Sequence, residues 1–288
     1  MLAVVNVWLD VISALLAAGI ILGFIIPHFI GSVVTGRVRE HFFENHWGPV
    51  EHRAHDPNTY GYGHPYADDF PLSARTWHWI NIISFFFLAA SGIYIRYPYF
   101  DGGREIMRYV HYFFMYIVTF NLFFRLYLLK NDWRNYLIFD LDDLKMVPSV
   151  LKYYAFIGPP YEHKKKYNPI QRQTYPMLWA LIGLQALTGF IIFRPELVPG
   201  FISGTIGGTA SLAAWMRVVH SANMRIMFLV VTIHSYLGIM EDYPVLKFFW
   251  FGVEPDWESL KHDGHGDSHD LEKELEDESE ESEPELTH

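Results

Sequence analysis

Long apolar stretches separated by polar loops dominate this chain. Five of them are long enough to cross a bilayer, which takes about 20 mostly apolar residues per helical span. They cover residues 4–30, 77–97, 109–129, 175–193 and 213–240. Because backbone polar groups in hydrocarbon must be paired within the segment, each is predicted to be a helix. The pattern therefore predicts an all-α integral membrane protein.

The first stretch, interrupted by Asp10 and by Pro27-His28, has two interpretations. A cleaved signal peptide would begin with a basic region and have a shorter apolar core, and neither feature is present. We therefore expect residues 1–34 to be a retained N-terminal transmembrane helix. A cytoplasmic loop over 35–74, a four-helix bundle over 75–245 and a tail over 246–288 complete the predicted organisation.

Basic residues set the expected orientation. The loop between the third and fourth spans is rich in them: Lys130, Arg134, Lys145, Lys152, Lys164, Lys165, Lys166 and Arg172. The loop between the fourth and fifth spans has none from Pro195 to Met216. Because Lys and Arg favour the cytoplasmic side, the N-terminus is predicted to lie outside and the C-terminus in the cytoplasm.

Composition changes this picture in two ways. The 288 residues are 51% hydrophobic but carry a net charge of −10, and the acidic residues crowd the 246–288 tail, which we expect to be disordered. No nucleic-acid partner is expected. The absence of cysteine excludes disulfides, iron–sulfur clusters and covalent haem attachment, so a redox centre would need other ligands.

Four histidines lie in the last four predicted spans: His78, His111, His220 and His234. An ionisable side chain in a span is costly and usually marks function. Taken singly, each histidine is equally well explained by a hydrogen bond to a neighbouring helix. The set of four, however, shows a regular arrangement.

His220 and His234 belong to the same predicted helix and are 14 residues apart. At about 100° and 1.5 Å per residue, their side chains point within about 40° of each other and lie about 21 Å apart along the axis. One helix thus presents two imidazoles at two depths. Two haems stacked across a membrane need such a helix, because each iron takes an axial ligand from either side.

The predicted orientation sorts the four histidines into level pairs. His111 and His220 both lie near the outer ends of their spans, and we call them the outer pair. His78 and His234 both lie toward the cytoplasm, and we call them the inner pair. Each pair is predicted to ligate one haem iron, so the sequence favours a four-helix di-haem cytochrome b bundle plus one extra N-terminal transmembrane helix.

Arginine precedes three of these histidines by three residues, at Arg75, Arg108 and Arg217. Residues i and i+3 share a helix face, so each guanidinium can pair with a haem propionate at the headgroup level. The alternative is that these side chains only extend to the interface, as arginines at membrane helix ends do.

Small residues in two spans give a weaker indication. Ser91-Gly92 and Thr188-Gly189 would let a flat macrocycle approach the backbone, although small residues also serve ordinary helix packing in membranes. The methionines of these spans are interpreted as packing residues rather than ligands.

These residues together resemble the b-type cytochrome subunit of membrane-bound nickel–iron hydrogenases and, more distantly, the membrane subunits of formate dehydrogenase and thiosulfate reductase. The resemblance covers about 73–242. Its carriers are Arg75-Thr-Trp-His78-Trp79, Arg108-Tyr-Val-His111-Tyr112, Arg125-Leu-Tyr127, Tyr167-Asn168-Pro169-Ile170-Gln171, Thr188-Gly189-Phe190, Arg217-Val-Val-His220, His234-Ser-Tyr236 and Glu241-Asp242.

The resemblance implies two haem b groups in a multi-pass protein of the prokaryotic inner membrane. It also implies an external nickel–iron large subunit, whose electrons arrive through an iron–sulfur small subunit. The implied acceptor is a membrane quinone (menaquinone or ubiquinone) beside the inner haem, where Asn168 is a candidate hydrogen-bond donor to the quinone carbonyl. Apart from that quinone site, the resemblance implies no catalytic centre.

The first span and the acidic tail are additions to the usual pattern of that family. Two other functions stay open. The same di-haem module can serve a molybdenum oxidoreductase of the thiosulfate reductase or formate dehydrogenase type. A haem-free transporter or structural membrane anchor is an alternative of another class.

Overall fold

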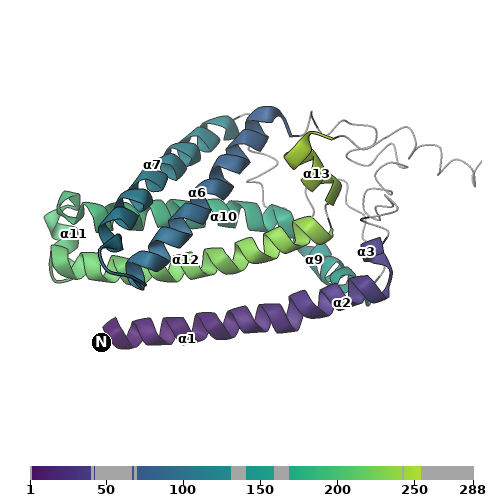
Figure 1. The fold of residues 1–288 in the computed structure, drawn as a ribbon, viewed down its shortest axis with the longest axis horizontal. Helices are drawn as coiled ribbons and strands as arrows, with labels where there is room; N and C mark the ends of the chain where they lie inside the picture. Colours follow the sequence, from purple (N-terminus) through teal and green to yellow (C-terminus); the bar gives the residue numbers. More distant parts are fainter. Residues whose placement is uncertain are drawn as a thin grey trace, which may run out of the picture.

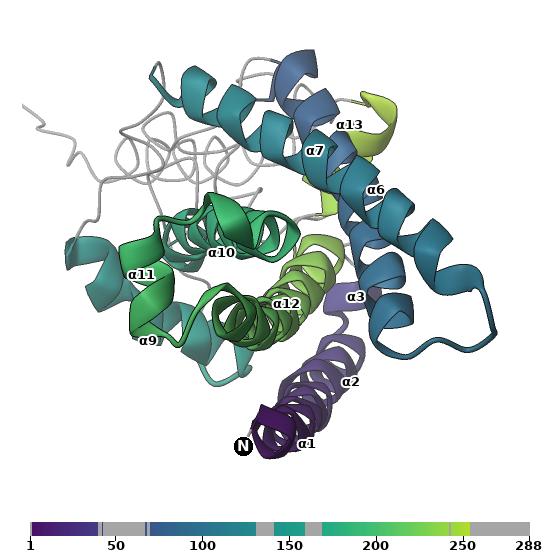
Figure 2. The same cartoon turned by 90° about the vertical axis from the view of Figure 1, so that its left-hand side faces the viewer.

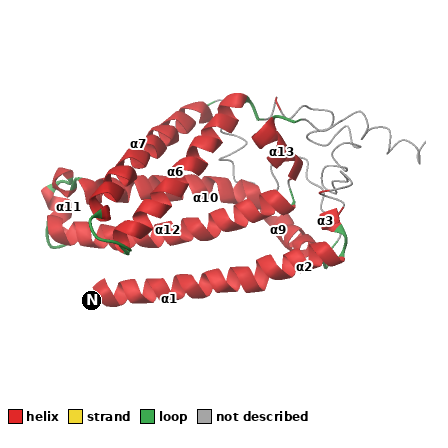
Figure 3. Cartoon of the chain, in the orientation of Figure 1, coloured by secondary structure: helices red, strands yellow, loops and turns green. Residues whose placement is uncertain are grey.

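A computed structural model describes residues 2–39, 42, 67, 70–130, 141–158, 169–241 and 243–253. Every regular element in these ranges is helical, which confirms the predicted all-α fold (Figure 3). The acidic tail beyond 253, most of the predicted 35–74 loop and the quinone candidate Asn168 lie outside the described residues.

Four long helices form the bundle. α6 (Leu72–Arg96) and α7 (Gly103–Leu129) pack against each other as an antiparallel pair, and α10 (Pro169–Phe193) packs in the same way on α12 (Thr209–Met240) (Figures 1 and 2). A short loop joins α6 to α7. In that loop Gly102 adopts φ = 80°, a left-handed conformation that costs glycine no steric penalty.

The extra N-terminal helix is a nearly continuous rod of α1 (Leu2–Ile20), η1 (Ile21–Ile25) and α2 (Ile26–Val34). It runs along α12 on the outside of the bundle (Figures 1 and 2). With a mean hydropathy of 2.5 it is the most apolar of five described helices that are long and apolar enough to span a membrane. The five predicted spans are therefore confirmed as helices.

The bundle has an apolar exterior and a partly polar interior. Large side chains such as Phe86, Phe120 and Phe123 are exposed, whereas Ser84 and Thr188 are buried. A small cluster around Val118, Ile182 and Met227 forms an apolar core between the helices. This inside-out distribution fits a lipid environment, where small and polar residues hold helices together.

Short elements close the two ends of the bundle. η3 (Pro195–Leu197) and α11 (Gly200–Thr205) lie at the end that also carries the N-terminus, while α3 (Arg37–Arg39) and two further helices, α9 and α13, lie at the opposite end (Figure 1). Both further helices add to what the sequence indicated.

α9 (Leu141–Tyr154) forms from a segment of the basic loop and packs against the end of the bundle that also carries α3 and α13. Val150, Tyr153 and Tyr154 are buried there against residues of η1, α10 and α12. α13 (Tyr243–Phe251) runs across position 246, where the acidic tail was expected to begin. The ordered structure therefore continues past the end of the predicted four-helix domain.

Candidate functional site

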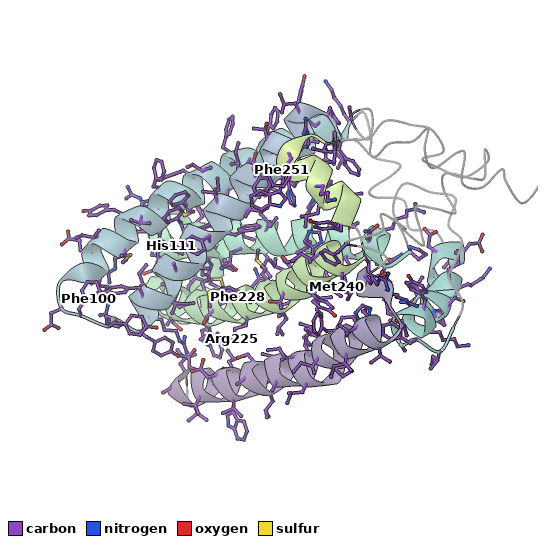
Figure 4. The ribbon with its side chains drawn as sticks, turned by 45° about the vertical axis from the view of Figure 1, so that its right-hand side comes forward. Phe100, His111, Arg225, Phe228, Met240 and Phe251 are labelled. Atoms are coloured by element: carbon purple, nitrogen blue, oxygen red, sulfur yellow. The ribbon has the colours of Figure 1, made fainter. Side chains whose placement is uncertain are left out.

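The four membrane histidines meet in the two pairs predicted from their depths. The ring centroids of His111 and His220 are 6.3 Å apart, and those of His78 and His234 are also 6.3 Å apart. α12 is unbroken between its two histidines, so the pairs lie about 21 Å apart along that helix. Side chains from α6 and α7 complete the pairs, and Figure 4 shows His111 within the bundle.

In the outer pair, hydroxyl groups of neighbouring helices hold both imidazoles. His111 Nδ1 is 2.9 Å from Ser91 Oγ, and His220 Nδ1 is 2.9 Å from Thr188 Oγ1. Each hydroxyl donates its own proton to a backbone carbonyl one turn back, at 2.6 Å for Ser91 and 2.7 Å for Thr188. A hydroxyl has only one proton, so both imidazoles must donate from Nδ1.

This hydrogen bonding determines which imidazole nitrogen is available. With the proton on Nδ1, the Nε2 atom of each neutral ring keeps its lone pair, which is the form that ligates a metal. Such a hydrogen bond from the distal nitrogen is the usual way in which a protein orients a ligating histidine. The outer pair is therefore arranged as two opposed ligands.

The separation fits an iron atom between the rings. Two imidazole–metal bonds of about 2 Å, with about 1 Å from each nitrogen to its ring centre, add to about 6 Å between centroids. Among the described residues no group of three or more His, Asp or Glu gathers around a point. A planar macrocycle that supplies the other ligands accounts for paired imidazoles better than a bare ion does.

Glycine lies beside each ring of the outer pair. A Cβ at Gly92 would approach His111 Cε1 to 3.4 Å, and one at Gly189 would approach His220 Cε1 to 3.2 Å. The pattern is symmetric, because each helix pair contributes one hydroxyl residue followed by one glycine. These positions keep side chains away from the space next to the imidazoles.

The inner pair lies in an aromatic surrounding. Phe249 of α13 is 5.3 Å from His78, and Tyr175 of α10 is 6.1 Å from His234, between ring centroids. Trp79 Nε1 donates to the Phe249 carbonyl at 3.1 Å, which holds α13 over the start of α6. His78 Nδ1 is buried and has no hydrogen-bond partner in the described structure, so no described hydroxyl orients this ring as Ser91 and Thr188 orient the outer rings.

The three arginines predicted near haem propionates differ in their surroundings. Arg108 and Arg217 are exposed one turn before the histidines of the outer pair. Arg75 is half-buried and donates to the Phe248 carbonyl at 3.1 Å, while its Nε has no hydrogen-bond partner in the described structure. Arg75 therefore also fixes α13 to the bundle, a role that was not predicted.

Comparison with known proteins identifies the family. Over residues 69–252 the chain matches the family model of prokaryotic cytochrome b561. The chain belongs to that family. This cytochrome b561 is thus an integral membrane protein with haem b as its cofactor, and the four histidines all lie within the matched region.

A related protein also supports the resemblance to hydrogenase cytochromes. The probable Ni/Fe-hydrogenase B-type cytochrome subunit of Cupriavidus necator is 23% identical to this cytochrome b561 over 196 residues, which cover 60% of this chain and 79% of the relative. The resemblance to hydrogenase-type b cytochromes is therefore confirmed. The region that matches the family model, 69–252, does not include the extra N-terminal helix.

Two buried polar residues near the site have surroundings that sequence reasoning did not predict, and of the two only Arg125 was named there, as part of a motif. Arg125 is buried with its guanidinium 5.4 Å from the Trp77 ring and 5.2 Å from the Trp179 ring. Asn223 is buried on α12, where it donates to the Leu181 carbonyl at 2.8 Å. An intramembrane Arg or Asn was a signal available in the sequence, but its partners lie on other helices.

Proposed function

We propose that this cytochrome b561 carries electrons across the membrane through two b haems, from an external nickel–iron hydrogenase to a membrane quinone. Two opposed imidazole pairs, each 6.3 Å between ring centroids and both built on α12, are the observation that supports this proposal. His111 and His220 would hold the outer haem, and His78 and His234 the inner one.

When bound, each haem supplies a one-electron carrier. The protein's own residues determine how that carrier is held. Ser91 and Thr188 fix the orientation of the outer imidazoles, and the low-dielectric bundle together with the charges near it tunes the potential. Arg75, Arg108 and Arg217 are proposed to neutralise propionates, Arg108 and Arg217 from the exposed positions in which they lie.

The proposed partner follows from the relative, whose name describes a hydrogenase subunit. An iron–sulfur small subunit would deliver electrons at the outer pair, and a nickel–iron large subunit would supply them from hydrogen. The distribution of basic residues supports an N-terminus outside the cytoplasmic membrane and a C-terminus in the cytoplasm. The outer pair then faces the partner and the inner pair faces the cytoplasm.

The quinone is proposed to react beside the inner pair. Tyr175 and Phe249, which face the two rings of this pair, offer aromatic surfaces for a quinone ring. Asn168, immediately before α10, is the proposed donor to a quinone carbonyl. Menaquinone and ubiquinone both fit this chemistry.

The haem assignment can be tested by counting. Purified protein should contain two haem b per chain by pyridine haemochrome. His220→Ala should remove only the outer haem and His234→Ala only the inner one, because each deletes one axial ligand. Retention of both haems in either variant would refute the pairing, and a colourless preparation from haem-replete cells would favour a transporter or anchor.

The partner and the direction need separate experiments. Affinity purification from membranes should recover an iron–sulfur subunit together with a nickel-containing one. Recovery of a molybdenum subunit instead would assign the same module to a thiosulfate reductase or formate dehydrogenase type of complex. In liposomes, hydrogen-driven reduction of quinone by the complex should generate a membrane potential, and its absence would contradict electron transfer across the bilayer.

A further inference from the structure

A buried acid–base pair joins the extra N-terminal helix to the bundle. His28 of α2 is 2% exposed and Glu241, at the end of α12, is 6% exposed. His28 Nε2 lies 3.3 Å from Glu241 Oε1. Because charged groups are almost never fully buried unless they are paired or functional, this pair calls for an explanation.

The other side of the His28 ring is held in place. The Tyr236 hydroxyl donates to the Ile25 carbonyl at 3.2 Å and lies 2.8 Å from His28 Nδ1. The Nδ1 side of the ring is thus occupied by the tyrosine hydroxyl, and Nε2 is the nitrogen that faces Glu241.

The pair is incompletely satisfied. His28 Nε2, both carboxylate oxygens of Glu241 and the Oγ of Ser32 are buried without a hydrogen-bond partner in the described structure. Ser32 follows His28 by one helical turn and is 1% exposed. Buried polar atoms normally have partners, if necessary ordered water. The cluster thus has unused capacity to bind water or to accept protons.

The backbone is π-helical, rather than α-helical, just before His28. The π-helical turn η1 (Ile21–Ile25) ends three residues before His28, and single π turns inside α-helices are frequent at functional sites. Its last carbonyl, that of Ile25, accepts the Tyr236 hydrogen bond. The π turn therefore belongs to the hydrogen-bond network of the pair.

Glu241 lies beyond the inner pair along the line of α12. It is the C-terminal cap of that helix and follows His234 by seven residues, which is about 10 Å along the axis. That direction leads to the end of the bundle where α3, α9 and α13 lie (Figure 1). The carboxylate thus lies between the inner pair and the proposed cytoplasmic side.

We propose that His28 and Glu241 form a proton-loading site, which takes up a proton from the cytoplasm when the inner haem is reduced and passes it toward quinone. This inference rests on the proposed function. It also assigns a role to the extra helix, which supplies the imidazole of the pair.

Electrons and protons are transferred in equal numbers in this step. Reduction of the inner haem would add one negative charge, and uptake of one proton from cytoplasmic water by the His28–Glu241 pair would offset it. The electron and the proton would then both pass to the quinone. Two such cycles deliver two electrons and two protons, which convert one quinone to one quinol.

Among the described residues outside its own helix, the groups around the His28 imidazole come from α12 and from the segment that begins with α9. From α12 it meets Tyr236 and Glu241, and from α9 it meets Tyr154, whose ring centroid is 5.9 Å away. Phe156 also packs on it, at 5.2 Å, and the guanidinium of Arg37 lies 4.4 Å from the Phe156 ring on the cytoplasmic side.

The test is the pH dependence of the inner haem potential, measured by spectroscopic redox titration of the full-length protein with both haems bound. In the wild type this potential should fall as pH rises, with a slope approaching about 59 mV per pH unit for one proton per electron. His28→Gln and Glu241→Gln keep similar size and polarity but remove the exchangeable proton. Each should reduce the slope to less than half while the outer haem potential keeps its wild-type behaviour.

Asp10→Asn is the matched control. Asp10 ties the other end of the same helix to Arg96 and Arg225, so its loss loosens the helix without touching the pair. A flattened slope in this variant as well would show that the slope reflects only helix docking, and would overturn the proposal.

Three other results bear on the proposal. An inner haem potential that does not vary with pH in the wild type overturns it, even if one of the variants fails to fold. A wild-type slope in both Gln variants also overturns it, and if these variants still reduce quinone the proposed function stands. A protein without haem would instead refute the proposed function itself.

Discussion

The hydroxyl of Thr188 offers the sharpest single test of the outer site. Thr188→Val keeps the shape of the side chain but removes the oxygen that accepts the proton of His220 Nδ1 at 2.9 Å. Thr188 is 2% exposed, so water cannot readily take its place. The variant leaves the imidazole with the backbone carbonyl of Gln185 as its remaining partner, so one of two hydrogen bonds to the ring is lost.

The size of the effect follows from the lost hydrogen bond. One such bond contributes about 0.5–1.5 kcal/mol, and about 1.4 kcal/mol corresponds to a factor of ten in binding. The outer haem should therefore bind about 2- to 12-fold more weakly.

The assay is transfer of haem from the purified variant to an excess of apomyoglobin, followed at wavelengths that separate the two haems. Thr174→Val is the matched control, because Thr174 lies on the same helix and its hydroxyl makes the same bond to a carbonyl one turn back, at 2.9 Å. The control should lose haem at the wild-type rate. Equal retention in the Thr188 variant, or loss of the inner haem instead, would falsify the assignment of Thr188.

Three further predictions follow from the packing. Gly189→Val should expel the outer haem, because even a Cβ at this position would lie 3.2 Å from His220 Cε1. Gly183→Val on the same helix is the control, since a Cβ there has no neighbouring atom within 4 Å, and this variant should keep the outer haem. The number of haems per chain is the measurement. Asp10→Asn should speed hydrogen–deuterium exchange in residues 2–20 while both haems stay bound, because the ion pairs of this helix with Arg96 and Arg225 are lost. Gly31→Ala should separate the extra helix from the bundle, because the added Cβ would collide with the Phe156 ring. Protease cleavage after α2 should then be faster. Gly19→Ala is the control, since no atom lies near its Cβ, and it should not change the cleavage rate.

Local pattern was enough to predict the framework of this protein. Hydropathy located the five helices, because the bilayer imposes a length and an apolar composition on each span. The 14-residue spacing of His220 and His234 predicted two levels, because both residues lie on one uninterrupted helix whose geometry is regular. Depth then paired His111 and His78 with these two, and the structure brings the same rings together.

Contacts between distant segments could not be obtained in this way. The sequence marked Ser91-Gly92 and Thr188-Gly189 as small residues, but only the packing of α6 on α7 and of α10 on α12 shows that the hydroxyls bind imidazoles. Pro27-His28 was interpreted as an interruption of an apolar span. Its partner Glu241 is more than 200 residues away, and no periodicity within one helix reports such a contact.

The sequence by itself thus predicted the membrane-spanning segments, the relative depth of each histidine and the class of cofactor to which the histidines are suited, because these follow from properties along one helix. The tertiary structure alone decided which imidazole nitrogen is held, that α13 covers the inner pair, and that the extra helix brings His28 to Glu241. These depend on side-chain directions and distances between helices, which are set when the whole bundle packs.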